Sequence, residues 1–397
     1  LDASILNLQK AIHFEPNFSD AHRHLALTFQ DKGDIREAIR QIDKALSLEP
    51  ENDGWKVLRA LLLPVILSSQ KEIDKVRKAL AKSVTKLCEL NLEITDPLSD
   101  SGITNFYLAY HDQNNKNLIE SIANLHLTTC PGLTYKAKHC SSVDKNRKSM
   151  LRVGFLSSFF TNHTITKLTR GIIEHLSRDQ FEVILFRSKG KESESSGVLD
   201  HSSDRTVLLM GKLEEDRERI EKESLDILFY PDIGMSAHTY FLSFSRLAPV
   251  QIVSWGHPDT TGVPNIDYFV SSNLLEDENT STHYSEKLIT LNTLPTFYFR
   301  PAKPEITCTR MDFGLPVDTR LYFCPQALFK FHPKFDGILG ELLRRDTGGR
   351  LVLIDDDRSK NWNKLFLDRF QQSFPDVASH VIFVSRMSEE QFFSLLS

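Results

Sequence analysis

The chain has 397 residues, of which 40% are hydrophobic and 25% are charged, and its formal net charge is −5. This length exceeds one ordinary domain of ~100–200 residues, so we expect two or three domains of a soluble globular protein. A net negative charge without long basic blocks argues against a general nucleic-acid binder. The most apolar stretch, 57–67, contains Arg59 and Pro64 and is much shorter than the ~20 residues of a membrane span, so we expect a buried helix there.

The five cysteines show neither a metal-binding pattern nor a disulfide framework. They are widely spaced, odd in number and without a Cys-x-x-Cys pair, and a reducing cytoplasmic compartment fits them best. Their positions are Cys88, Cys130, Cys140, Cys308 and Cys324.

An internal repeat with a period of 34 residues marks the first fifty positions and predicts tetratricopeptide repeats over 1–52. The complete repeat covers 19–50, with its turn at Gly33, and the repeat before it contains only its second helix. An array opened inside a repeat would expose an apolar face, so we expect the N-terminus to be that of a fragment. The matching pairs are Leu8 with Ile42, Ala11 with Ala45, and Pro16 with Pro50.

The next region, 53–135, is predicted to be a helical extension without the repeat signature. Apolar residues recur there at spacings of three and four, and a second helical stretch is predicted over 105–126. A Cys130-Pro131-Gly132 turn and the polar run 136–149 then predict a connecting loop.

Strands and helices alternate over 150–305, which predicts an α/β lobe with a mostly parallel sheet. The serine-rich stretch 188–203 is predicted to be a mobile loop. The predicted strands are 151–156, 181–186, 227–230, 250–255 and 268–271, and the predicted helices are 166–176 and 214–223.

A second α/β series covers 312–397 and is expected to be incomplete, because its three predicted strands are fewer than the ~4–6 of a common sheet. The fold class is therefore α/β with an N-terminal all-α region. The predicted strands of this series are 321–324, 351–354 and 381–384, and its helices are 334–345, 364–373 and 389–396.

Lys330 is the first candidate site residue. It follows the strand 321–324 and Pro325 and precedes a helix, and this is where open α/β sheets bind ligands. A cation at this place can neutralise a diphosphate that a helix N-terminus also attracts. The alternative is an ordinary surface lysine in a loop.

Three polar loops follow successive strands of the first lobe and share one edge of the predicted sheet, which favours a site. His163 can donate a hydrogen bond or act as a base, or it is simply exposed in a helix-capping loop. Asp232 can be a general base or can orient a histidine, or it caps a helix. The third loop, 255–262, is rich in hydroxyl groups and turn residues.

Metal and cofactor motifs are weak or missing, and we expect neither a metal nor a resident cofactor. Asp355-Asp356-Asp357 contains an Asp-x-Asp pair that can hold Mg²⁺ or Mn²⁺, but the charged residues after it favour a solvated loop. Zinc-hydrolase, Walker, dinucleotide-binding and Gly-x-Ser-x-Gly motifs are absent from the sequence.

In their order along the chain, these motifs resemble the protein O-GlcNAc transferase and SPINDLY family, and above all its bacterial members with tetratricopeptide repeats. The resemblance covers nearly the whole chain. After the repeats it is carried by Leu-Arg-Val-Gly-Phe-Leu-Ser-Ser-Phe-Phe-Thr-Asn-His from Leu151, by Leu-Ala-Pro-Val-Gln-Ile-Val-Ser-Trp-Gly-His-Pro-Asp-Thr-Thr-Gly from Leu247, and by His-Tyr-Ser-Glu-Lys-Leu from His283.

The resemblance implies an inverting GT-B glycosyltransferase with two Rossmann-like lobes, which transfers GlcNAc from UDP-GlcNAc to serine or threonine hydroxyls of proteins without a metal. Protein or peptide acceptors would bind through the repeats, and neither nucleic acid nor a membrane is expected as a partner. Lys330 matches the lysine at the donor diphosphate, and His163 matches the histidine that faces donor and acceptor, with Asp232 as the alternative base. The other matches are Ser385, Arg386 and Met387 at the uracil and Pro258, Thr260 and Thr261 along the cleft.

The chain departs from the family at two places. Ala327 stands where a glutamine is expected, and Gln326, one residue earlier, is the candidate donor contact. Family members also continue beyond the position of Ser397 into a glycine- and threonine-rich phosphate loop, and a natural polypeptide without that loop should have little transferase activity. Two other functions stay open: a non-catalytic interaction protein with a vestigial transferase lobe, and transfer of another sugar such as fucose from a GDP donor.

Overall fold

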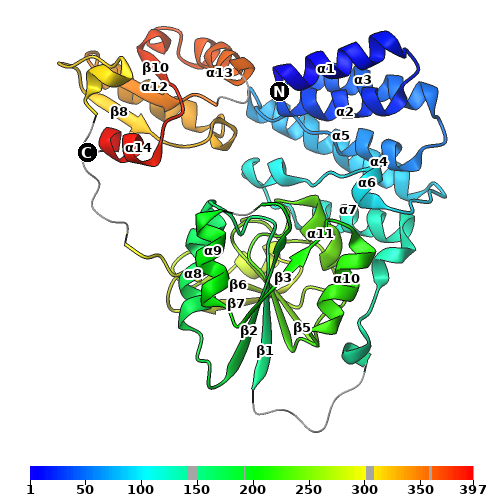
Figure 1. Cartoon of the computed structure of the whole chain (residues 1–397). Coiled ribbons are helices and arrows are strands. Elements are labelled where there is room, and N and C mark those ends of the chain that lie inside the picture. Colours follow the sequence, from blue (N-terminus) through cyan, green and yellow to red (C-terminus); the bar gives the residue numbers. More distant parts are fainter. Residues whose placement is uncertain (142–149, 192, 301–307, 357–359, 397) are drawn as a thin grey trace. The chain divides into compact units, whose positions relative to one another are not determined.

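The computed structural model describes residues 1–141, 150–191, 193–300, 308–356 and 360–396, which fold into two compact units (Figure 1). Unit 1 consists of Leu1–Leu80, Tyr110–Asp112 and Pro301–Ser397, and unit 2 consists of Ala81–Ala109 and Gln113–Arg300. The predicted helical extension does not form a unit of its own, because the chain passes from unit 1 to unit 2 within α5 (Gln70–Cys88). Within the described ranges, no helix has the length and apolar character that a membrane crossing requires.

Unit 1 begins with paired helices that match the predicted repeat. Small residues lie where α2 and α3 cross, and Ala26, Ala38 and Ala45 are fully buried there. Gly33 takes a positive φ of 83° in the turn, and the Asp34 side chain accepts a hydrogen bond from the Glu37 amide and so caps α3. The helices are α1 (Asp2–Phe14), α2 (Ser19–Asp31), α3 (Ile35–Leu48) and α4 (Asp53–Leu61).

The apolar stretch 57–67 is buried, but it is helical only as far as Leu61, so the prediction of a helix was wrong for its second half. Pro64 cannot continue a helix, because its ring clashes with the preceding turn and it has no N–H to donate. Leu62 is accordingly extended, at φ −61° and ψ 125°. The loop still contributes buried side chains, including Leu63 and Val65.

The second lobe also belongs to unit 1. Its described residues form a three-stranded parallel sheet in the order β10-β9-β8, and the three strands lie where the sequence predicts them. Val352 and Val384 lie in its core, and Phe366 and Phe370 of α13 pack in a row with Phe374, which follows this helix. The elements are β8 (Leu321–Cys324), α12 (Phe335–Arg345), β9 (Arg350–Ile354), α13 (Lys360–Ser373), β10 (Val381–Val384) and α14 (Glu389–Leu396).

Helix α13 of the second lobe packs directly on the turn between α2 and α3. The Trp362 indole nitrogen donates to the Asp31 carbonyl oxygen at 3.0 Å, and the Asn361 side chain donates to the Lys32 carbonyl oxygen at 3.2 Å. Trp362 is 1% exposed and lies against Gly33. The repeat and the second lobe are therefore one packed body, although 250 residues and more separate them in the sequence.

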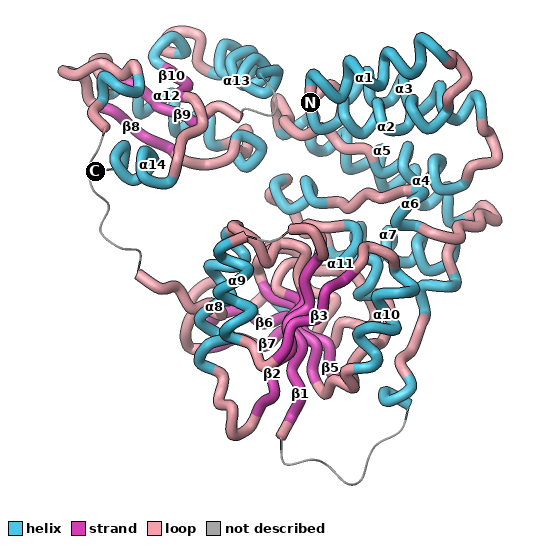
Figure 2. The backbone as a smooth tube through the Cα atoms, in the orientation of Figure 1, coloured by secondary structure: helices cyan, strands magenta, loops and turns pink. Residues whose placement is uncertain are grey.

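The described residues of unit 2 form a seven-stranded parallel sheet in the order β3-β2-β1-β4-β5-β6-β7, seen as one twisted sheet between helices in Figure 2. Figure 1 shows α8 and α9 on one side of this sheet and α10 and α11 on the other. The strands are β1 (Leu151–Leu156), β2 (Phe181–Ser188), β3 (Arg205–Leu209), β4 (Ile227–Tyr230), β5 (Val250–Ser254), β6 (Tyr268–Ser272) and β7 (Lys287–Leu291). The helices are α6 (Pro97–Asp100), α7 (Lys116–Thr129), α8 (Thr164–His175), α9 (Glu194–Ser202), α10 (Leu213–Lys222) and α11 (Ala237–Ser243).

The strand order reverses between β1 and β4, because the chain runs outward from β1 to β3 and then returns to the other side of β1. In an open parallel sheet the helices on the two faces then diverge, and the loops after these two strands border a crevice. This topological switch point places the loops that contain His163 and Asp232 next to each other.

Several elements differ from the sequence predictions for unit 2. The stretch 188–203, predicted to be a loop, contains α9, which a capping box of Ser193 and Ser196 begins. The predicted helical stretch 105–126 is a short 3-10 helix, η1 (Phe106–Tyr110), followed by α7. Strands β3 and β7, at the two edges of the sheet, and helix α11 were not predicted. Part of the predicted connecting loop, 142–149, lies outside the described residues.

Candidate active site

Asp232 lies at the switch point and is completely buried. It follows β4, and the Ser157 hydroxyl, which follows β1, donates to its Oδ2 at 2.6 Å. Its Oδ1 has no hydrogen-bond partner within the described part of the chain. Burial raises the pKa of the Asp232 carboxyl to about 7, because removal from water disfavours the charged form. This geometry connects the loops after β1 and β4 and keeps the carboxyl away from solvent.

His163 is half-buried and caps helix α8. Its Nδ1 accepts a hydrogen bond from the Ile165 amide at 3.2 Å, and its ring lies 4.8 Å from that of Phe159. The capping residue is therefore His163 itself and not Asn162 or Thr164, because a ring nitrogen replaces the usual side-chain oxygen. In the neutral ring this bond leaves the proton on Nε2, so His163 is arranged as a hydrogen-bond donor.

The third polar loop is turned inward onto a buried acid, Glu286. The Thr260 hydroxyl donates to Glu286 Oε2 at 2.7 Å, and the amide and hydroxyl of Thr261 both donate to Oε1, the amide at 2.8 Å. Each threonine is 3% exposed. Of the loop residues predicted to line the cleft, Pro258 is exposed, whereas the two threonine hydroxyls are used inside the protein.

The same loop is held from two other sides. Asn115, at the start of α7, donates its side-chain amide to Asp259 Oδ2 at 2.7 Å. Gly256 donates its amide to the Pro231 carbonyl oxygen at 2.9 Å, and a Cβ at this glycine would lie only 2.3 Å from that oxygen. A side chain at position 256 would therefore separate the loops after β4 and β5.

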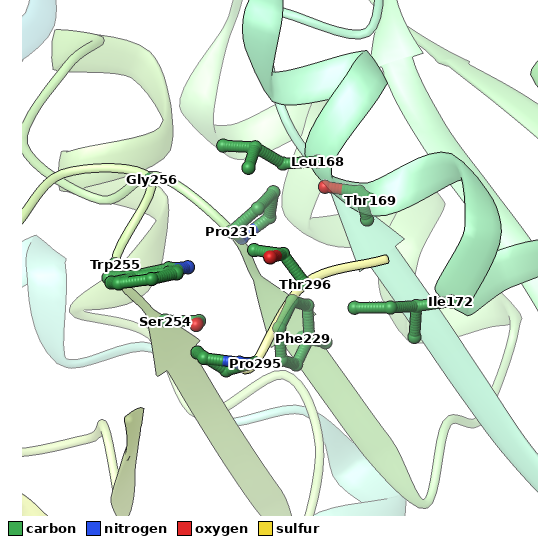
Figure 3. Close-up of a pocket in the computed structure, with 10 residues that line it drawn as sticks. All are labelled: Leu168, Thr169, Ile172, Phe229, Pro231, Ser254, Trp255, Gly256, Pro295 and Thr296. Atoms are coloured by element: carbon green, nitrogen blue, oxygen red, sulfur yellow. The ribbon is translucent and has the colours of Figure 1, made fainter. Parts of the chain in front are cut away.

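A small pocket lies between α8 and the ends of β4 and β5 (Figure 3). Its volume is about 10 Å³, roughly that of one water molecule, so it is far too small for a sugar ring. We conclude that it is a packing gap beneath the candidate site and not the substrate pocket. Its lining residues are Leu168, Thr169, Ile172, Phe229, Pro231, Ser254, Trp255, Gly256, Pro295 and Thr296.

In unit 1, Lys330 ends a short 3-10 turn, η6 (Leu328–Lys330), beyond the carboxyl end of β8. The side chain is exposed, but its neighbours are fixed: Phe329 packs edge-on against Tyr110 at 5.0 Å, and Leu328 and Phe331 are buried. An exposed cation on an anchored turn suits contact with an anionic ligand. Gln326 is also exposed in the loop that leads to this turn.

Ser385, Arg386 and Met387 follow β10 at the same edge of the second-lobe sheet. Ser385 and Arg386 are exposed, and Met387 packs against the core of the lobe. Because the strands are parallel, these residues and Lys330 lie at one carboxyl edge, with β9 between them. The structure thus places the predicted donor-binding residues of the second lobe together in unit 1. The predicted site residues of the first lobe lie in unit 2.

Sequence reasoning did not nominate two residues of the site, Ser157 and Glu286. Ser157 precedes the predicted histidine loop and had no distinguishing pattern. Glu286 was part of the His-Tyr-Ser-Glu-Lys-Leu motif, so an acid among hydroxyl-rich segments was a signal that could have been used.

Helical repeats followed by two parallel-sheet lobes define a glycosyltransferase fold of the GT-B-like class. The chain shares this fold with a variant of the O-GlcNAc transferase of Thermobaculum terrenum, with a TM-score of 0.71, 18% sequence identity, and coverage of 98% of this chain and 72% of that one. Residues 104–303 match Glycosyl transferase family 41, and the chain belongs to this family.

Two curated relatives are similar to parts of the chain. The probable UDP-N-acetylglucosamine–peptide N-acetylglucosaminyltransferase SEC of Arabidopsis thaliana is 25% identical over 215 residues, which is 51% of this chain and 22% of the relative. The UDP-glucose:protein N-beta-glucosyltransferase of Actinobacillus pleuropneumoniae is 30% identical over 154 residues, which is 37% of this chain and 23% of the relative. The matched part of the chain thus spans less than a quarter of each of these relatives.

Proposed function

We propose that the chain is part of an inverting protein glycosyltransferase that transfers GlcNAc from UDP-GlcNAc to serine or threonine hydroxyls without a metal. The observation that carries the proposal is Lys330, an exposed lysine on an anchored turn at the carboxyl edge of a parallel sheet. Family membership and the names of the relatives support a nucleotide-sugar donor and a protein acceptor. The repeats would hold the acceptor protein.

In the proposed reaction, the acceptor hydroxyl oxygen forms a bond to the anomeric carbon while the bond from that carbon to the diphosphate oxygen breaks, and the hydroxyl proton passes to the departing diphosphate or to solvent. Negative charge develops on the leaving diphosphate, and Lys330 would stabilise it in place of a metal. His163, with its proton on Nε2, would donate a hydrogen bond to the bound substrates. The burial of Asp232 favours a role in fixing the Ser157 loop over direct contact with the acceptor.

The donor sugar is the open part of this proposal, because one relative is named as a UDP-glucose enzyme. Hydrolysis of UDP-GlcNAc, UDP-glucose and GDP-fucose by the full-length protein would identify the donor. We expect UDP-GlcNAc to be the preferred one, and turnover of GDP-fucose alone would contradict the assignment of the nucleotide.

The role of Lys330 is tested by Lys330→Ala, with UDP affinity measured by calorimetry. We expect a loss of about tenfold or more, as for one charge-assisted hydrogen bond to phosphate. Lys334→Ala is the matched control, because Lys334 is an exposed lysine of the same loop that pairs with Asp112 at 3.0 Å. Equal UDP affinity in Lys330→Ala and the parent protein would defeat the donor-site assignment.

A further inference from the structure

Arg369 of helix α13 is a buried cation beside the Lys330 turn. Its side chain is 2% exposed and pairs with Asp336 of α12, Nη2 to Oδ1, at 2.7 Å. The guanidinium lies over the Phe366 ring, 4.3 Å from its centroid. A charge at this depth persists only with hydrogen-bonded partners, since burial of an unpaired charge is very costly.

The same guanidinium also connects two loops of unit 1. Its Nη1 donates to the carbonyl oxygens of Leu67 and Phe331, each at 3.1 Å. Leu67 lies in the segment between α4 and α5, and Phe331 directly follows Lys330. The backbone next to Lys330 is therefore attached to the helical region through one side chain.

Only arginine can make this set of contacts. Its planar fork presents several donors at fixed angles, whereas a lysine ammonium is a single point of attachment on a flexible chain. The Asp336 carboxylate fixes the orientation of the fork and is itself held by the Ser373 hydroxyl at 3.2 Å. The contact to Phe331 is thus set by a buried ion pair between α12 and α13, in which both side chains are 2% exposed.

We propose that Arg369 is a positioning residue for the donor site: it holds the Phe331 carbonyl, and hence the Lys330 turn, in the geometry that contacts the donor diphosphate. The inference rests on the proposed function of Lys330. It assigns an effect on nucleotide affinity, exerted through Lys330, to a buried residue that does not itself touch the substrate. It also makes the segment around Leu67 part of the support of the donor site.

The test is a double-mutant cycle on UDP affinity and on the kinetic constants of the full-length protein. Arg369→Lys should lower UDP affinity about tenfold and raise the donor KM, with a smaller change in kcat, because a misplaced Lys330 loses its phosphate contact. In the Lys330→Ala background, Arg369→Lys should have no further effect on UDP affinity, because residues that act through one contact are not additive.

Arg344→Lys is the matched control, because Arg344 lies on α12 and makes an exposed two-bond pair with Asp376 at 2.7 and 2.9 Å. It should leave UDP affinity unchanged. If Arg369→Lys does not fold, Asp336→Asn loosens the same guanidinium more gently, and it should weaken UDP binding in the parent but not in the Lys330→Ala protein.

Two results would overturn the inference. One is UDP affinity within twofold of the parent in a folded Arg369→Lys protein. The other is an equal loss of UDP affinity in both backgrounds, which would indicate general destabilisation. Failure of the proposed function has a different signature, since Lys330→Ala alone would then leave UDP affinity unchanged.

Discussion

Trp362 donates its indole N–H to the backbone oxygen of Asp31, 3.0 Å away, and this bond joins the second lobe to the turn of a helical repeat. The indole is 1% exposed, so both its hydrogen bond and its apolar surface are sealed from water. The repeat and the lobe with the Lys330 turn consequently share one core.

We expect Trp362→Phe to destabilise unit 1 by about 1 kcal/mol through the lost hydrogen bond, and Trp362→Ala by about 3–5 kcal/mol through the added cavity. Urea unfolding followed by circular dichroism measures both. Leu367→Ala on the same helix is the control, because Leu367 is 42% exposed and should cost much less. A Trp362→Ala protein as stable as the control would contradict the packed contact between α13 and the repeat.

Glu286 should determine the order of the loop that contains Thr260 and Thr261. Replacement by alanine leaves two buried hydroxyls and one amide without their acceptor, at a cost of about 1–3 kcal/mol for each group left unsatisfied. Hydrogen exchange of the Thr261 amide should become faster in Glu286→Ala. Glu278→Ala is the control, because Glu278 is exposed. An unchanged exchange rate of the Thr261 amide in Glu286→Ala would rule out the anchoring role.

His126 should make the protein less stable in acid. It is fully buried among Tyr240, Phe241 and Phe244, and burial lowers its pKa to about 4. Below pH 6.5 the histidine binds a proton in the unfolded state but stays neutral in the folded state. The free energy of unfolding therefore falls as the pH drops from about 6.5 to about 4.

His126→Phe keeps an aromatic ring in this cage and should remove that part of the pH dependence, on the order of 3 kcal/mol between pH 7 and pH 4. Denaturant midpoints at the two pH values measure it. His13→Gln is the control, because His13 is exposed. Some acid sensitivity should remain, because burial also lowers the pKa values of His111 and His257 to about 4.

Asp232 should make the protein less stable as the pH rises, which is opposite to the effect of His126. Its folded-state pKa of about 7 exceeds the usual 3.8, so the folded protein keeps a proton that the unfolded chain releases between these values. Stability therefore declines as the pH rises from about 4 to about 7 and is constant above that. Asp232→Asn keeps an oxygen acceptor for Ser157 and should be more stable than the parent at pH 7.5 but not at pH 4.

The same variant separates two roles of Asp232. If it fixes the Ser157 loop, Asp232→Asn should retain most of the transferase activity of the full-length protein. A complete loss of turnover with unchanged UDP affinity would instead identify Asp232 as the catalytic base.

The sequence was informative wherever local pattern decides structure. Strand β4 was predicted at its observed bounds because a buried parallel strand is a continuous apolar run, and the repeat was predicted because its small residues lie where two helices cross. Helix α9 was missed because its signal is a pair of serines, Ser193 and Ser196, in a stretch without apolar periodicity.

The orientation of the site residues was beyond sequence reasoning. Thr260 and Thr261 were predicted to line the cleft, and their hydroxyls bind Glu286, which lies 26 and 25 residues further along the chain, respectively. The support of the Lys330 turn by Arg369 likewise depends on how two helices pack. Contacts of this kind follow from tertiary structure, for which a single sequence has no local signal.

Gly33 limits how far the repeats can be exchanged. Repeat arrays are often treated as modules that can be shortened, extended or grafted, because each unit contacts only its neighbours. The turn of this repeat is different, since a Cβ at Gly33 would lie 3.0 Å from the Trp362 ring and its φ of 83° already disfavours other residues. A chimera that replaces the array must therefore keep the 31–34 turn, or it will detach the helix that also carries Arg369.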